Sequence, residues 1–129
     1  MYTSYYRQTV ELKKQGCILV GISRTLPRWT PRPDYWETDL APSVDLFREK
    51  ELPWDVYKKR YLKELASKRA LVENILRKYE KMENDSETAN IVFLCYESSL
   101  YESWTCHRIL LSEFAKKEFG INIEEVVNG

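Results

Sequence analysis

Hydrophobic residues follow two different spacings along this chain. Residues 17–22 and 91–96 are nearly continuous apolar runs of strand length, a pattern typical of strands covered on both faces. Over 54–65 and 71–82, apolar residues instead recur every three or four positions, with charged residues between them. That spacing places the apolar residues on one face of a helix. The chain is therefore predicted to contain two buried strands and, between them, two amphipathic helices.

Capping residues and alternation predict the remaining elements. Ser43 suits the N-cap of a short helix, and Pro53 and Ser67 suit the starts of the two amphipathic helices. The last helix is predicted to open at Cys106 and to end at Gly120. The shorter predicted elements are a strand over 1–4, a helix or turn over 6–14 and an edge strand over 121–127.

The order of these elements predicts the fold. Strands separated by helices need crossover connections, which favour parallel pairing. We therefore predict a single α/β domain over residues 1–129 with three layers, a mostly parallel sheet with helices on both faces. In such sheets ligands bind outside the carboxyl ends of the strands, because loops and helix N-termini gather there. The loops over 23–33 and 97–105, which follow the two buried strands, are expected to face one another.

The charge balance limits the classes of partner. The 129 residues include 20 Lys or Arg and 20 Asp or Glu, so the formal net charge is zero and no strong overall field attracts nucleic acid. Any nucleic-acid binding is expected to be weak and local. No segment approaches the roughly 18 apolar residues of a membrane span, and the N-terminus lacks a signal-peptide pattern. We expect a cytoplasmic protein that does not bind membranes, either a monomer or a homodimer.

The cysteines are the first candidates for chemistry. Three cysteines without paired spacing argue against a disulfide framework, so Cys17, Cys95 and Cys106 are expected to be free thiols. Cys106 stands at the predicted helix start beside His107 and Arg108, where the helix dipole and nearby cations lower the pKa of a thiol. We therefore take Cys106 as the candidate nucleophile. Cys95, at the end of a buried strand, is either a packing residue or part of the ligand pocket.

Two further residues could act with Cys106 as acids or bases. At 100° per residue, His107 falls on the apolar side of its helix, so it is predicted to point toward the sheet with Cys106 and Arg108 flanking it. A structural, hydrogen-bonded histidine and a catalytic base both remain open interpretations of His107. Glu97, in the loop after the second buried strand, is a candidate acid or base.

The loop after the first buried strand carries candidate anion ligands. Ser23, Arg24 and Arg28 lie in a segment stiffened by prolines. Arg24 is expected to face the Cys106 helix, where Arg108 and the backbone N–H groups of the helix start would complete a clamp for phosphate or carboxylate. The alternative is that these arginines are simply solvated. The partner that this arrangement favours is a phosphate-bearing small molecule or a nucleotide.

Other kinds of site lack support in the sequence. There is no Gly-rich phosphate loop, so we predict no nucleotide cofactor. A zinc site built from Cys95, Cys106 and His107 is disfavoured, because structural zinc usually takes four ligands in closely paired spacings. The chain has one histidine and no Cys-x-x-Cys pair, so no metal is predicted.

Two segments near the candidate site resemble a known family. Residues 94–97 read Leu-Cys-Tyr-Glu and residues 106–108 read Cys-His-Arg. Together they resemble the hallmark of domain of unknown function family 488 of bacteria and archaea. Residues 2–5, 22–24 and 40–43 are similar to that family too, although the loop over 97–105 is longer than the common pattern. The resemblance covers nearly the whole chain and implies an α/β fold with a Cys, His and Arg site, but no settled activity.

Two functions from different classes remain. The first is an enzyme acting on an anionic small molecule, nucleotide or nucleic-acid end, with Cys106 as nucleophile, His107 and Glu97 as proton-transfer groups, and Arg24 and Arg108 as anion clamps. The second is a module that binds an anion, nucleic acid or another protein without catalysis. The enzyme requires an accessible, ionised Cys106, and the binding module does not.

Overall fold

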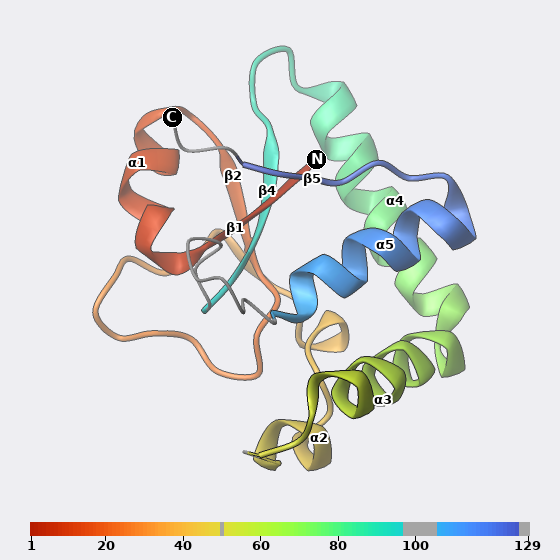
Figure 1. Cartoon of the computed structure of the whole chain (residues 1–129). Helices are drawn as coiled ribbons and strands as arrows, with labels where there is room; N and C mark the ends of the chain where they lie inside the picture. The colour runs from red at the N-terminus through yellow and green to blue at the C-terminus, as the bar shows by residue number, and fades with distance from the viewer. Residues whose placement is uncertain (50, 97–105, 127–129) are drawn as a thin grey trace.

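The sheet at the centre of the molecule is parallel throughout. The computed structural model describes residues 1–49, 51–96 and 106–126 of the chain. Its five strands lie in the order β3-β2-β4-β1-β5. They are β1 (Tyr2–Tyr5), β2 (Ile18–Gly21), β3 (Tyr35–Trp36), β4 (Ile91–Cys95) and β5 (Glu124–Glu125). Figure 1 shows β1, β2, β4 and β5 between the helices. The two predicted buried strands are β2 and β4, and they pair directly with one another.

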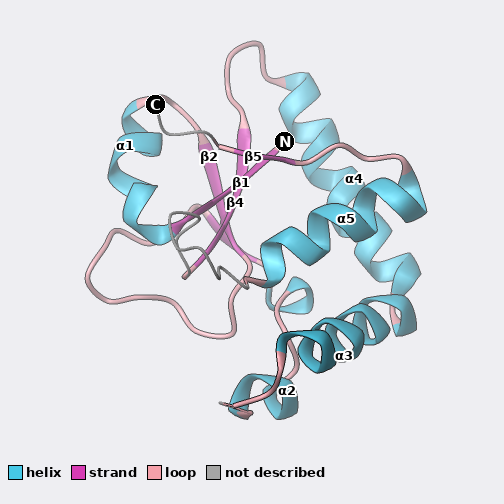
Figure 2. Cartoon of the chain, viewed as in Figure 1, coloured by secondary structure: helices cyan, strands magenta, loops and turns pink. Residues whose placement is uncertain are grey.

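Helices cover both faces of this sheet. One face carries α1 (Thr9–Lys14), which a short 3-10 turn, η1 (Tyr6–Gln8), precedes. The other carries α4 (Arg69–Asp85) and α5 (His107–Phe119), as Figure 2 shows. α3 (Trp54–Ser67) packs on α5, and the short α2 (Val44–Arg48) packs on α3. The predicted three-layer α/β architecture is confirmed. No helix in the described part of the chain is long and apolar enough to cross a membrane.

The central strand β4 supplies side chains to two hydrophobic clusters. Ile91, Phe93 and Cys95 belong to the larger cluster, with α3, α4 and α5. Val92 and Leu94 belong to the smaller one, on the α1 side. Successive side chains of a strand point to opposite faces, so a strand covered on both faces must be apolar at every position. This is the physical reason for the continuous apolar run in the sequence.

The predicted helix starts are partly right. Ser43 is the N-cap of α2, and its hydroxyl accepts a hydrogen bond from the Leu46 backbone N–H at 3.1 Å. The prediction for Ser67 is wrong, because this residue ends α3 and its hydroxyl donates to the Glu64 carbonyl. The N-cap of α4 is Lys68, whose side chain makes no capping bond. A single residue, Lys68, separates the two helices. The start of α4 therefore lies one residue later than the capping preference of Ser67 suggested.

The last helix begins and ends where the sequence predicted. Cys106 is the N-cap of α5, so its Cα lies just before the first helical turn. Gly120 follows the helix with φ of 66°, a left-handed conformation that glycine adopts without the steric penalty of a Cβ. The edge strand β3 was not predicted, since it has only two residues and both side chains are exposed. A 3-10 turn, η2 (Thr38–Leu40), then leads toward α2.

Candidate functional site

The carboxyl ends of the inner strands meet at the start of α5. Tyr5 of β1 and Cys95 of β4 are register partners, and Gly21 of β2 pairs with Leu94. Directly after β2, the carbonyl of Ile22 accepts a hydrogen bond from Nε2 of His107 at 2.5 Å. The segment that follows β2 and the first residue of α5 therefore lie in contact at this edge of the sheet.

A cavity of about 240 Å³ opens at this edge, between the end of β2 and helices α2, α3 and α5. We call it the Arg24 cavity. Its apolar wall comes from the α2 region, with Pro42, Leu46 and Phe47. Its polar lining consists of Ser23, Arg24, Glu49, Tyr57, Tyr96 and His107. The sequence had selected Ser23, Arg24 and His107. It missed the other three: Glu49 and Tyr57 carry no motif, and Tyr96 lies within the Leu-Cys-Tyr-Glu segment but was not chosen as a site residue.

Arg24 is held in the cavity by neutral groups. Its Nε and Nη2 atoms donate to the Pro42 carbonyl at 3.1 and 2.9 Å, and Nη2 also donates to the Thr38 carbonyl at 3.2 Å. Nη1 makes no hydrogen bond to any described residue. Backbone carbonyls fix a guanidinium without neutralising its charge, so Arg24 remains a source of positive potential. Glu49 is the acidic side chain in the polar lining.

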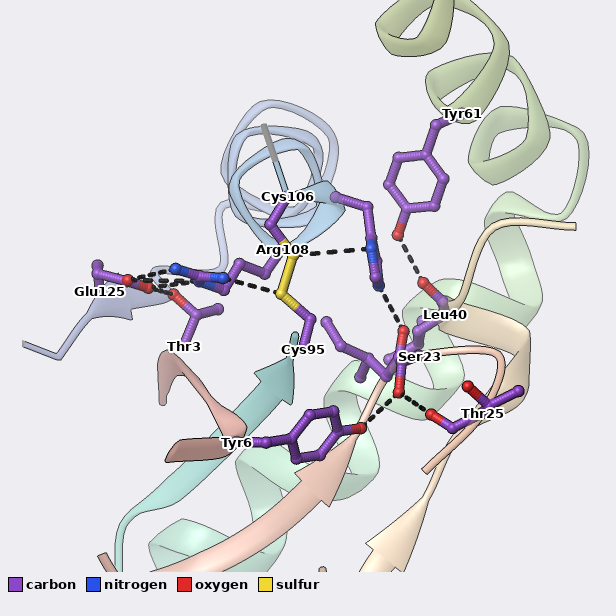
Figure 3. Close-up of a disulfide and its surroundings, with 12 residues drawn as sticks. Thr3, Tyr6, Ser23, Thr25, Leu40, Tyr61, Cys95, Cys106, Arg108 and Glu125 are labelled. Atoms are coloured by element: carbon purple, nitrogen blue, oxygen red, sulfur yellow. Dashed lines mark hydrogen bonds and ion pairs between the residues drawn. A yellow bond between two sulfur atoms is a disulfide. The ribbon is translucent and has the colours of Figure 1, made fainter. Parts of the chain in front are cut away.

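Ser23 is positioned by a buried hydrogen-bond chain. Its hydroxyl donates to the Thr25 carbonyl at 2.6 Å, and therefore accepts from the Tyr6 hydroxyl at 2.5 Å (Figure 3). Burial raises the pKa of Tyr6 to about 12, so Tyr6 stays protonated and keeps donating. The Trp36 indole donates to the Ser23 carbonyl at 2.8 Å. Ser23 thus lines the cavity as part of a rigid wall.

His107 separates the cavity from the cysteines. Because the Ile22 carbonyl can only accept, Nε2 must carry the proton, and Nδ1 then has a lone pair directed at Cys106 Sγ, 3.8 Å away. Tyr61 packs edge-on against the ring with centroids 5.5 Å apart. Burial lowers the pKa of His107 from 6.5 to about 4; the bond to Ile22 opposes this shift and the charge of Arg108 adds to it. At neutral pH His107 is therefore uncharged, with its Nδ1 lone pair on the side of Cys106.

The expectation of three free thiols is wrong. Cys95 and Cys106 are joined by a disulfide, with Cα atoms 7.1 Å apart, and only Cys17 is a free thiol. The chain spacing of 11 residues gave no sign of this pairing, which arises because β4 ends beside the N-cap of α5. Both sulfur-bearing residues are buried, Cys95 at 0% and Cys106 at 1% exposure. Nucleophilic chemistry at Cys106 therefore requires prior reduction.

Arg108 lies away from the Arg24 cavity. Its side chain is fully buried, and its Nε and Nη2 atoms each donate to the Glu125 carboxylate at 3.0 Å. Its Nη1 atom donates to Cys95 Sγ at 2.8 Å. Figure 3 shows Arg108 and Glu125 on one side of the cysteine pair and Ser23 on the other. The sequence had suggested that Arg24 and Arg108 form one anion clamp. Arg24 lines the cavity, whereas Arg108 contacts Glu125 and Cys95, so this prediction is wrong.

The remaining predicted site residues have different positions. Arg28 is exposed in the loop after β2 and is not among the residues that line the cavity. Glu97 falls in the segment outside the described residues. Sequence reasoning missed Glu125, whose carboxylate also accepts from the Thr3 hydroxyl at 2.6 Å. Its only signal was an acidic residue in an alternating edge strand.

The comparison with protein families gives a match to most of the chain. A family model for DUF488-N3a, described as the active DUF488-N3 subclade, matches residues 3–118. The chain belongs to the DUF488 family. No curated protein and no solved structure gives a significant match. In this DUF488 chain the matched region includes both hallmark segments, 94–97 and 106–108.

Proposed function

We propose that this DUF488 protein is an enzyme that acts on a small anionic molecule bound in the Arg24 cavity. The observation that carries the proposal is the position of Arg24, whose charge is held by backbone carbonyls at the carboxyl edge of a parallel sheet. Ligands of open α/β sheets bind at this edge. His107 forms another wall of the cavity, and the sulfur of Cys106 lies 3.8 Å from its Nδ1 atom.

The size of the cavity favours a small ligand. Its volume is about 240 Å³, below the roughly 300–1,000 Å³ of pockets that bury drug-sized molecules. A phosphate or carboxylate group with a modest organic part would fit. A nucleic-acid duplex would not, and the zero net charge of the chain gives it no long-range attraction to one.

The reactive group that we assign to this enzyme is the Cys106 and His107 pair. After reduction, the thiol of Cys106 would face the lone pair of His107 Nδ1, the arrangement by which an imidazole activates a thiol. The lowered pKa of His107 keeps that lone pair unprotonated at neutral pH. The proposed active form is therefore the reduced protein.

The second candidate is a binding module without catalysis. The specific observation in its favour is the burial of Cys106, which leaves 1% of the residue exposed. A substrate would need access to that sulfur, whereas an anion bound by Arg24 would not.

Calorimetric titration of the reduced protein with inorganic phosphate and with a nucleoside monophosphate tests the binding step. A charge-assisted contact contributes about 1.5–3 kcal/mol, so Arg24→Ala should weaken binding about 10- to 100-fold. Arg28→Ala is the matched control, since Arg28 is exposed in the same loop, and its affinity should equal that of the parent. Equal affinities of the parent and Arg24→Ala, or no anion binding by the parent, would refute the proposal.

Turnover separates the enzyme from the binding module. The reduced parent should hydrolyse or transfer a group from a phosphate or carboxylate ester, and Cys106→Ser should lose that activity while still binding phosphate. Arg24-dependent binding with no turnover across such esters would favour the binding module.

A further inference from the structure

The cysteine pair and His107 together have the make-up of a metal site. Cys95 Sγ, Cys106 Sγ and His107 Nδ1 all lie within 4.8 Å of one another, and all three residues are buried. We propose that, once Cys95 and Cys106 are reduced, these three atoms bind a thiophilic divalent metal ion such as Zn²⁺. The fourth coordination position is left to water or to the substrate. This inference rests on the proposed function only for the place of the substrate. It replaces the free Cys106 thiol by a metal ion as the reactive group.

One of the ligand distances already suits a tetrahedral ion. Bonds of about 2.3 Å to sulfur and about 2.0 Å to nitrogen put neighbouring ligand atoms roughly 3.5–3.8 Å apart. Cys106 Sγ and His107 Nδ1 are already 3.8 Å apart. The Cα atoms of Cys95 and Cys106 are 7.1 Å apart, beyond the roughly 4.4–6.8 Å usual for disulfides. After reduction, this backbone spacing allows the two sulfurs to separate to the distance that a shared ion requires.

The groups around the ligands are those that metal ligands need. A histidine that binds a metal through one nitrogen usually donates its other ring N–H to a carbonyl or carboxylate, which fixes the tautomer. The Ile22 carbonyl does this for His107, so Nδ1 is the nitrogen left for a metal. Arg108 donates to Cys95 Sγ at 2.8 Å, a bond that becomes stronger when the sulfur is a thiolate.

The local charges also balance. Two thiolates neutralise a divalent cation, and the charge of Arg108 is paired with Glu125 on the far side of Cys95. Reduction of the disulfide takes two electrons from an added phosphine, which is oxidised to its oxide with oxygen from water. Metal binding then releases the two thiol protons to solvent.

A catalytic zinc site typically has three protein ligands and an open fourth position, whereas a structural zinc site has four protein ligands. No metal was predicted from the sequence, because these three residues were judged by the standard of a four-ligand structural site with closely paired cysteines. Since His107 lines the Arg24 cavity, an ion on its Nδ1 would lie one side chain away from a bound anion. An ion held there by Cys95, Cys106 and His107 would supply the Lewis-acid chemistry of metal-assisted hydrolysis.

Titration with Co²⁺ tests the proposal on the full chain. The protein is reduced with a phosphine, stripped with a chelator and titrated with Co²⁺ under anaerobic conditions. We expect one equivalent to produce a sulfur-to-cobalt charge-transfer band and the intense visible bands of a tetrahedral ion, and Zn²⁺ to abolish them. Cys106→Ser and Cys95→Ser should bind at least about 100-fold more weakly, more than the loss typical of an outer-shell partner. Cys17→Ser is the matched control and should bind like the parent.

If the reduced parent shows none of these bands, the metal site is refuted. This result does not depend on whether any variant folds. Unchanged Co²⁺ affinity in Cys106→Ser would overturn the metal site too. Arg24→Ala keeps all three ligands, so it should keep the cobalt spectrum. A parent without cobalt bands that still binds phosphate through Arg24 would remove the metal and leave the anion site standing.

Discussion

Replacing Glu125 by alanine should destabilise the fold strongly, because it removes the carboxylate that pairs with a buried arginine. The side chain of Arg108 is 0% exposed and that of Glu125 is 25% exposed. Their contact is bidentate, with two N–H···O distances of 3.0 Å. The pair also ties α5 to the edge strand β5, so its loss affects two elements that lie against β1.

The expected size of the effect follows from burial. Removing one member of a fully buried pair costs about 3–5 kcal/mol, because the remaining charge loses its partner in a low-dielectric interior. Glu125 is a quarter exposed, so water can enter the space it leaves, and Arg108 keeps its contact with Cys95. We therefore expect a loss of about 1.5–3 kcal/mol, the range for a hydrogen bond to a charged group.

Urea unfolding at pH 7, followed by tryptophan fluorescence in a fixed redox state, measures this loss. Glu124→Ala is the matched control, since Glu124 is the exposed neighbour in the same strand, and it should change the unfolding free energy by no more than about 0.5 kcal/mol. The double variant Arg108→Met with Glu125→Leu removes both charges, and should lose less stability than Glu125→Ala alone. If Glu125→Ala and Glu124→Ala unfold at the same urea concentration, the argument from the buried charge is wrong.

Two further predictions concern His107 and the helix caps. The folded pKa of His107, about 4, lies below its ordinary 6.5, so the unfolded chain takes up the proton first as pH falls. The metal-free protein should lose about 3 kcal/mol between pH 6.5 and 4 through this residue, and a His107→Gln variant with the same pH slope as the parent would contradict this. Ser43→Ala should cost about 1.5–3 kcal/mol, because the Ser43 hydroxyl caps α2 and also donates to the Glu64 carboxylate. Ser67→Ala, which caps nothing, should stay within about 0.5 kcal/mol in the same urea assay.

Most of the architecture could be read from the sequence, because the signals are local. Continuous apolar runs predicted β2 and β4, and three-to-four spacing predicted α3 and α4, since these periods follow directly from strand and helix geometry. The parallel topology followed from the order of the elements. It placed Ser23, Arg24 and the start of α5 at one edge, where the structure brings Arg24 and His107 into one cavity.

The shortest elements were not predicted, because too few of their side chains are buried to give a hydrophobic pattern in the sequence. The two residues of β3 are both exposed, so neither alternation nor a run of apolar residues marks them. The start of α4 at Arg69 was misplaced, because a break of one residue between adjacent helices is finer than capping preferences can resolve.

At the site, the order of the elements along the chain predicts which residues could meet, whereas the direction of each side chain depends on the packing of α5. Cys106, His107 and Arg108 are adjacent, but successive residues at a helix start diverge by about 100°, so they cannot all point into one cavity. Their directions are set by partners distant in the chain. His107 turns to the Ile22 carbonyl, Cys106 to Cys95 across the end of β4, and Arg108 to the carboxylate of Glu125. Periodicity along one helix contains no information about those partners, because their contacts exist only once α5 is packed on the sheet.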